Sequence, residues 1–213
     1  MTQMPLIPFA GAAKRLDDID LPRIGKTIGV GEDEIHAIID TETAGSGFDG
    51  AGRPRMLFEP HVFYRLLNRG GQAGLLARAS AMGLAYPKWG TQPYPRDSYP
   101  RLEQAMLLDR QTAMQSASWG LGQIMGFNCV MAGYTTVEAM VDAFMEDEEH
   151  QLEAMITFIV NAGLATRLRM HDWVGFARGY NGPGFAQNGY DKKLAASFAR
   201  WQKIKDTPLL TGD

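Results

Sequence analysis

Apolar residues recur at helical spacing along most of the chain, which predicts a mainly α-helical protein. The clearest pattern is Ile35, Ile38 and Ile39, which share one helical face. Glu42 follows two turns after Ile35 and returns to nearly the same angle. Glycines that soon follow allow the chain to leave the helix. We therefore expect an amphipathic helix whose last turn presents the Glu42 carboxylate on its apolar side.

The same spacing predicts about eight helices in all, with little strand. Besides the helix that ends near Glu42, they are expected at residues 20–29, 60–68, 75–82, 99–116, 137–144, 152–160 and 194–201. Asp20 is the expected cap of the first helix. The acidic run 146–149 is interpreted as a solvated helix start. Residues 55–58 are expected to form a short strand in a small β-hairpin lip.

No internal repeat or linker divides the chain, so one domain is predicted. We expect an irregular lead-in over residues 1–18, a domain over 19–205 and a polar tail over 206–213. With 213 residues, of which 45% are hydrophobic, the chain can bury a substantial core.

Charge and cysteine content narrow the classes of function. The 21 Lys and Arg residues are mixed with 24 Asp and Glu residues, which gives a formal net charge of −3 and no overall basic field for nucleic acid. A single Cys129 excludes an internal disulfide, and four scattered histidines show no metal-ligand spacing. We expect neither a metal nor another cofactor. No stretch is apolar enough to span a membrane, and residues 1–11 lack the basic start of a signal peptide.

Glu42 is the first candidate for chemistry. Apolar surroundings and the partial negative charge of a helix carboxyl end both disfavour ionisation of a carboxylic acid. A carboxyl group that keeps its proton near neutral pH can protonate the leaving oxygen in glycoside hydrolysis. The alternative is that Glu42 is an ordinary solvated helix end.

Three further segments have unusual composition. Residues 83–100 are rich in Gly, Pro, Tyr and Trp, which suits either sugar stacking or a rigid loop that covers the core. Residues 118–126 carry Gly120 and Gly122 in a stretch that otherwise looks helical, which indicates close approach of a ligand or tight packing against a neighbouring helix. Residues 179–184 read Gly-Tyr-Asn-Gly-Pro-Gly.

These segments together resemble the lysozyme-like superfamily of peptidoglycan-cleaving enzymes, and most closely the N-acetylmuramidase family of bacteriophage endolysins. The resemblance rests on Glu42 before a glycine-serine loop, Gly-Arg-Pro at 52–54, Leu-Phe-Glu-Pro-His-Val-Phe at 57–63, and Ser-Trp-Gly-Leu-Gly-Gln-Ile-Met-Gly at 118–126. It covers about residues 20–203. It implies a two-lobed helical fold with a small β-lip beside a cleft for a glycan strand.

The resemblance also implies roles for individual residues. Glu42 would be the general acid that cleaves the β-1,4 bond between N-acetylmuramic acid and N-acetylglucosamine, and Glu59 would be the second catalytic carboxylate. The residues expected to bind substrate are Asp49, His61, Trp119, Gly120, Gln123, Tyr180 and Asn181. Asp49 remains an alternative second carboxylate, and Glu59 has the alternative roles of helix cap or partner of Arg53.

Other functions remain as alternatives. A lytic transglycosylase shares the fold and the glutamate but yields 1,6-anhydro ends, and Glu59 favours hydrolysis instead. A zinc amidase needs clustered histidines, and a Cys-His peptidase would have to use Cys129, whose neighbours predict a core position. A non-catalytic glycan-binding structural protein of a phage is a further alternative.

The resemblance implies a place of action. We expect a monomer that binds peptidoglycan strands, neither binds nucleic acid nor inserts stably into a membrane, and accumulates in the cytoplasm of a bacterial host. A holin-type pore would then release it to the cell wall.

Overall fold

The computed structural model describes residues 9–43 and 45–208, which form a mainly helical fold with one small sheet. The α-helices are α1 (Asp20–Lys26), α2 (Glu32–Thr43), α3 (Pro60–Arg69), α4 (Ala73–Ala81), α5 (Tyr99–Met106), α6 (Arg110–Gln115), α7 (Val137–Glu146), α8 (Glu148–Asn161), α9 (Ala165–Arg169), α10 (Trp173–Asn181) and α11 (Tyr190–Trp201). The strands are β1 (Met56–Phe58), β2 (Ala117–Trp119) and β3 (Ile124–Met125), and the 3₁₀ turns are η1 (Gly126–Asn128) and η2 (Pro183–Ala186). The predicted fold class is confirmed, although eleven α-helices in the described residues exceed the eight expected. No helix among these residues has both the length and the apolar character that crossing a membrane requires.

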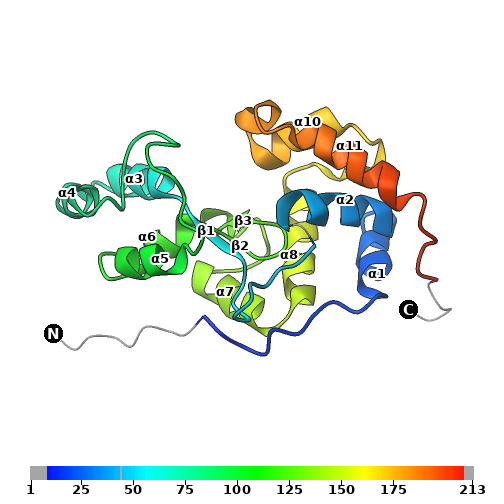
Figure 1. The fold of residues 1–213 in the computed structure, drawn as a ribbon, viewed down its shortest axis with the longest axis horizontal. Coiled ribbons are helices and arrows are strands. Elements are labelled where there is room, and N and C mark those ends of the chain that lie inside the picture. Colours follow the sequence, from blue (N-terminus) through cyan, green and yellow to red (C-terminus); the bar gives the residue numbers. More distant parts are fainter. Residues whose placement is uncertain (1–8, 44, 209–213) are drawn as a thin grey trace.

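Two hydrophobic clusters divide the fold into two lobes. Figure 1 shows α3 to α6 at one end and α1, α2, α10 and α11 at the other, with the sheet, α7 and α8 between them. Helix α8 contributes buried side chains to both cores. Ala154 and Phe158 pack in the first cluster, whereas Met155 and Ile159 pack in the second. The two lobes are therefore joined through one shared buried helix.

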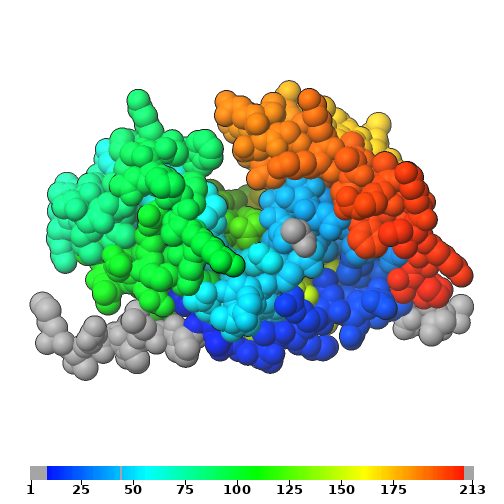
Figure 2. Space-filling view, in the orientation of Figure 1, coloured from blue at the N-terminus to red at the C-terminus, as the bar shows by residue number. Residues whose placement is uncertain are grey.

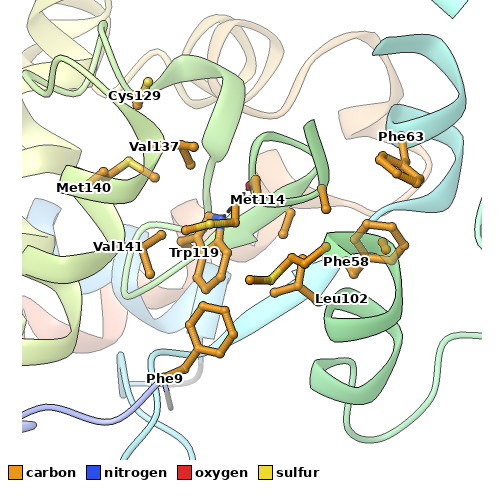
Figure 3. Close-up of a cluster of buried hydrophobic side chains, with 14 of the residues drawn as sticks. Phe9, Phe58, Phe63, Leu102, Met114, Trp119, Cys129, Val137, Met140 and Val141 are labelled. Atoms are coloured by element: carbon orange, nitrogen blue, oxygen red, sulfur yellow. Dashed lines mark hydrogen bonds between the residues drawn. The ribbon is translucent and has the colours of Figure 1, made fainter. Parts of the chain in front are cut away.

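Trp119 lies at the centre of the first cluster (Figure 3). Its side chain is 0% exposed, and its indole N–H donates to the carbonyl oxygen of Met114 at 3.0 Å. Phe9 is 4% exposed and lies 5.6 Å from the Trp119 ring, so part of the expected lead-in packs in this core. Residues 1–8 lie outside the described residues. Because Trp119 is enclosed, the prediction that it binds substrate is wrong.

The sheet is antiparallel with the order β1-β2-β3. The strand predicted at residues 55–58 is confirmed over Met56–Phe58, but its partner is β2, where Met56 faces Trp119. The lip thus combines the local hairpin of β2 and β3 with β1, which comes from a distant part of the chain. The helical interpretation of residues 118–126 is wrong, because they form β2, a turn and β3. Gly120 has a φ of +67°, a conformation that glycine adopts without strain.

Two helix boundaries also differ from expectation. The helix expected at residues 99–116 is two helices, because Asp109 starts a second one by accepting a hydrogen bond from the Thr112 N–H at 2.9 Å. Asp20 lies inside the first turn of α1 and not at its cap. Its carboxylate accepts from the Asp17 N–H at 2.8 Å, so the same residue organises the turn before the helix.

Helix α2 is held between the second core and α11. Ile35 and Ile38 are fully buried, as the amphipathic pattern predicted. On the other side, one Asp40 oxygen accepts from Ser197 at 2.7 Å, Arg200 at 2.5 Å and the Trp201 indole at 2.7 Å. These bonds fix the carboxyl-terminal half of α2, which carries Glu42, against α11.

Glu148 corrects the interpretation of the acidic run 146–149 as solvated. It is buried, and its carboxylate accepts from the Gly47 N–H at 2.7 Å, the Leu16 N–H at 3.1 Å and Arg15 at 2.8 Å. Gly47 belongs to the loop that follows Glu42. A single buried carboxylate therefore joins α8, the N-terminal segment and the loop beside the candidate acid.

Replacement of Glu148 by alanine is expected to lower the free energy of unfolding by about 3 kcal/mol, because the buried Gly47 N–H and the partly buried Leu16 N–H lose their acceptor. For a chain of this size that corresponds to a melting temperature lower by roughly 6–12 °C, measurable by circular dichroism. Glu149→Ala is the matched control. Glu149 forms a half-exposed ion pair with Arg23 at 2.5 Å, worth at most about 1 kcal/mol. Equal shifts for both variants would contradict the assigned role of Glu148.

Candidate active site

Glu42 occupies the last turn of α2 in a partly buried position, as expected. Its Oε1 accepts a hydrogen bond from Asn181 Nδ2 at 2.7 Å. Burial raises the pKa of Glu42 from 4.5 to about 7, while the Asn181 hydrogen bond and the charge of Lys193 limit the rise. A carboxyl group with this pKa is about half protonated near neutral pH, and so it can donate a proton to a substrate.

Glu42 lines a cleft of about 450 Å³. The space-filling view shows the surface hollowed between the lobe coloured green and teal and the lobe coloured orange (Figure 2). The residues that line the cleft come from α2, the glycine loop, β1, the segment before α5 and the turn before β3: Asp40, Thr41, Glu42, Thr43, Asp49, Arg53, Arg55, Met56, Arg96, Asp97, Ser98, Tyr99 and Gln123.

The end of α10 closes one side of the Glu42 position. Asn181 reaches Glu42, and its own Oδ1 is buried with no hydrogen-bond partner among the described residues. Tyr180 donates its hydroxyl hydrogen to the Gly122 carbonyl oxygen at 2.8 Å. Tyr180 thereby braces the turn before β3, and Asn181 offers a free acceptor beside the carboxyl group. The structure brings both predicted residues to Glu42.

Two residues of the turn between β2 and β3 have different roles: Gly120 packs in the interior, and Gln123 lines the cleft. A Cβ on Gly120 would lie 2.8 Å from the Phe144 ring and 2.9 Å from Gln151, so this glycine faces the interior. The prediction that Gly120 lets a sugar approach the backbone is therefore wrong, and tight packing explains the residue. Gln123 does line the cleft, held by a hydrogen bond from its Nε2 to the Gly120 carbonyl oxygen at 2.9 Å.

Asp49 lies in the cleft but is fully engaged by its own loop. Its oxygens accept from the N–H groups of Ala51 and Arg53 at 2.8 and 3.0 Å and from Arg53 Nε at 2.8 Å. Although burial acts in the opposite direction, these hydrogen bonds and the Arg53 charge hold the pKa of Asp49 below its usual value. Asp49 is thus a charged structural anchor of the glycine loop.

Glu59 stands at the N-cap of α3 but makes no capping hydrogen bond. Its Oε2 accepts a short hydrogen bond from the Tyr94 hydroxyl and lies 3.2 Å from His61 Nδ1. Arg53 pairs with Asp49 and Asp97, so the alternative of an Arg53–Glu59 pair is wrong. Glu59 is not among the residues that line the Glu42 cleft. Burial, and then the charges of Glu42 and Glu59, raise the pKa of Tyr190, so both carboxyl groups act on one phenol.

The comparisons with known proteins agree with this geometry. The family model described as N-acetylmuramidase matches residues 32–202. The chain belongs to the N-acetylmuramidase family. The resemblance stated from the sequence is therefore confirmed, and the chain is a glycosidase-type enzyme that acts on peptidoglycan.

A solved structure is also similar to this N-acetylmuramidase. The crystal structure of the endolysin of Burkholderia phage AP3 superposes with a TM-score of 0.77 at 36% sequence identity, over 90% of this chain and 73% of that one. No curated protein sequence matches the chain.

The Gly, Pro and aromatic segment before α5 supplies residues of this muramidase that the sequence did not assign. Tyr86 is buried and Tyr94 is partly buried, whereas Trp89 is 62% exposed. Tyr94 holds Glu59, a role that local sequence patterns could not show because the residues come from different segments. Only Trp89 keeps the exposure that the sugar-stacking interpretation requires.

The part of this muramidase that the structure describes contains no residues arranged for a metal site or for a reactive thiol. No group of three His, Cys, Asp or Glu residues there could hold a metal ion. Cys129 is buried, as its neighbours predicted, and burial raises the pKa of its thiol. A thiol that resists ionisation is a poor nucleophile.

Proposed function

We propose that the chain hydrolyses the β-1,4 bond between N-acetylmuramic acid and N-acetylglucosamine in peptidoglycan. Glu42 donates a proton to the departing sugar oxygen, and Glu59 assists water attack or stabilises positive charge on the sugar ring. Asn181 orients Glu42 and accepts a hydrogen bond from the substrate with Oδ1. The observation that carries this proposal is a carboxyl group of raised pKa, held by an amide in a cleft of a muramidase-family fold.

The choice of Glu59 as second carboxylate rests on its hydrogen-bonding state. The Asp49 oxygens are occupied by backbone and guanidinium donors of its own loop. Among the described residues Glu59 has only its Oε2 hydrogen-bonded, by the Tyr94 hydroxyl, with His61 Nδ1 3.2 Å away, and its charge acts on Tyr190 together with that of Glu42. Glu59 therefore retains an oxygen that is free to meet water or a sugar.

The test is mass spectrometry of the ends released from purified peptidoglycan. Hydrolysis yields reducible N-acetylmuramic acid ends. A lytic transglycosylase yields 1,6-anhydro ends that lack one water. Such ends would show that the reaction is an intramolecular attack and not hydrolysis. A non-catalytic glycan-binding protein would release no ends.

The activity is expected to fall as pH rises through about 7, because Glu42 must be protonated to act as an acid. Above that pH, kcat/KM should decrease about tenfold per pH unit. Initial rates of reducing-end release between pH 5 and pH 9 would measure this, with circular dichroism as a control for folding. A rate that stays constant to pH 9 would contradict the role of Glu42.

We further propose that the chain serves as a phage endolysin that lyses its bacterial host. The similar endolysin of a Burkholderia phage supports this role. On this proposal the protein accumulates as a monomer in the host cytoplasm and reaches the wall through a holin-type pore. Lysis of producing cells only when a pore-forming protein is co-produced supports the proposal, whereas lysis without it contradicts the dependence on a pore.

A further inference from the structure

The aspartates of the Glu42 cleft are already paired with arginines. Asp40 is bound by Arg200 of α11. Asp49 and Asp97 both pair with Arg53, at 2.7 and 3.2 Å. Glu42 itself is only about half ionised near neutral pH because burial raises its pKa to about 7. Each of these aspartates therefore already has an arginine partner, and among the residues that the structure describes none is paired with the remaining cations of the cleft.

Arg55 and Arg96 are those remaining cations. Both line the cleft and are exposed, and neither makes a side-chain hydrogen bond or ion pair with any residue that the structure describes. They come from different segments, one just before β1 and one before α5. The cleft therefore presents two unpaired guanidinium groups to whatever lies along it.

The backbones that carry these side chains are held in place. The Arg55 N–H donates to the Gly47 carbonyl oxygen at 2.7 Å, and the Arg55 carbonyl oxygen accepts from the Gly120 N–H at 2.8 Å. Arg96 precedes Asp97, whose carboxylate accepts from the Tyr99 N–H at 3.0 Å and pairs with Arg53. The guanidinium groups are thus anchored at their bases and free at their ends.

Two free guanidinium groups select carboxylates, because each offers planar paired donors and a permanent charge. The sugar rings and acetamido groups of a glycan strand carry no charge. In peptidoglycan the carboxylates belong to the short peptide attached to the lactyl group of each muramic acid, from its γ-linked glutamate and its carboxyl-terminal residues.

We propose that Arg55 and Arg96 form a subsite that binds carboxylates of the peptide stem while the glycan lies against Glu42. This inference rests on the proposed function, because a stem reaches the subsite only if a muramic acid occupies the cleft. The subsite makes the enzyme prefer strands that still carry their acidic peptides. It contributes to substrate binding and not to proton transfer.

The experiment compares soluble glycan strands that carry their peptides with the same strands after conversion of the carboxylates to amides with carbodiimide and ammonia. For the wild-type chain we expect KM to rise about five- to tenfold on amidation, with kcat changed less than twofold. For the double variant Arg55→Gln/Arg96→Gln we expect a KM on native strands equal to that of wild type on amidated strands. Amidation should then have no further effect on the variant.

The control is Arg78→Gln on the exposed surface of α4, which removes the same kind of charge outside the cleft. An equal rise in KM for this variant would show that any positive charge on the protein attracts the acidic strands. That result would overturn the subsite. So would a double variant that keeps the wild-type response to amidation. If the wild-type chain releases no reducing muramic acid ends from either substrate, the proposed function itself fails.

Discussion

Replacement of Glu42 by glutamine is expected to lower the rate of peptidoglycan cleavage by about 10³-fold or more. The amide keeps the size of the side chain and its ability to accept from Asn181, but it cannot transfer a proton. General acid catalysis contributes roughly 10²- to 10⁴-fold, and Asp49 in the same cleft cannot replace the acid because Arg53 favours its ionised form. Release of reducing ends from purified peptidoglycan measures the loss.

The same variant is expected to be more stable than wild type above neutral pH. The folded pKa of Glu42 is about 7 against 4.5 without the fold, so wild-type stability decreases as pH rises from about 4.5 through about 7. Glutamine removes this loss, by at most about 3 kcal/mol from the size of the shift. Melting temperatures should agree at pH 4 and favour the variant at pH 8.

The cleavage rate and the melting temperature of Glu42→Gln together distinguish a catalytic role of Glu42 from a structural one. A structural glutamate would lose stability and activity together when replaced. Near-normal cleavage by the stable variant would refute Glu42 as the acid. Reduced stability at pH 8 would show instead that the ionised carboxylate supports the fold.

The sequence predicted the fold where the determining interactions are local. The spacing of Ile35, Ile38 and Ile39 placed Glu42 correctly, because one buried helix face fixes both the helix and the direction of its last side chains. Residues 118–126 were misassigned because β2 and β3 hold only three and two residues, too few to show the alternation of a strand. Strand β2 also pairs with β1, which precedes α3 to α6 in the sequence, and the spacing within residues 118–126 contains no information about that pairing.

The site was predictable only in part for the same reason. The surroundings of Glu42 followed from its own helix, whereas Asn181, which comes from a distant part of the chain, was assigned to the site by resemblance alone. Trp119 was assigned to substrate binding by resemblance, and its complete burial places it in the core instead. Arg55 and Arg96 share the cleft only through the tertiary fold.

Replacement of Glu59 by glutamine is expected to lower kcat by about 10²-fold or more with a melting temperature within a few degrees of wild type. The variant loses the negative charge that would assist water or stabilise the sugar cation, a contribution typical of catalytic carboxylates. Asp49→Asn should show the opposite pattern. It removes the charge that binds Arg53 and weakens acceptors in the glycine loop, so stability decreases more than turnover.

Tyr94→Phe refines this comparison because it removes a donor from Glu59 without touching the carboxylate. Loss of this donor should leave the Glu59 carboxylate less firmly positioned, so kcat should decrease while the melting temperature stays close to that of wild type. A Tyr94 that only packs the loop would change stability and leave kcat unchanged. If instead Asp49→Asn abolishes turnover in a stable protein while Glu59→Gln remains active, Asp49 is the second carboxylate, and its tight binding by Arg53 serves catalysis as well as the loop.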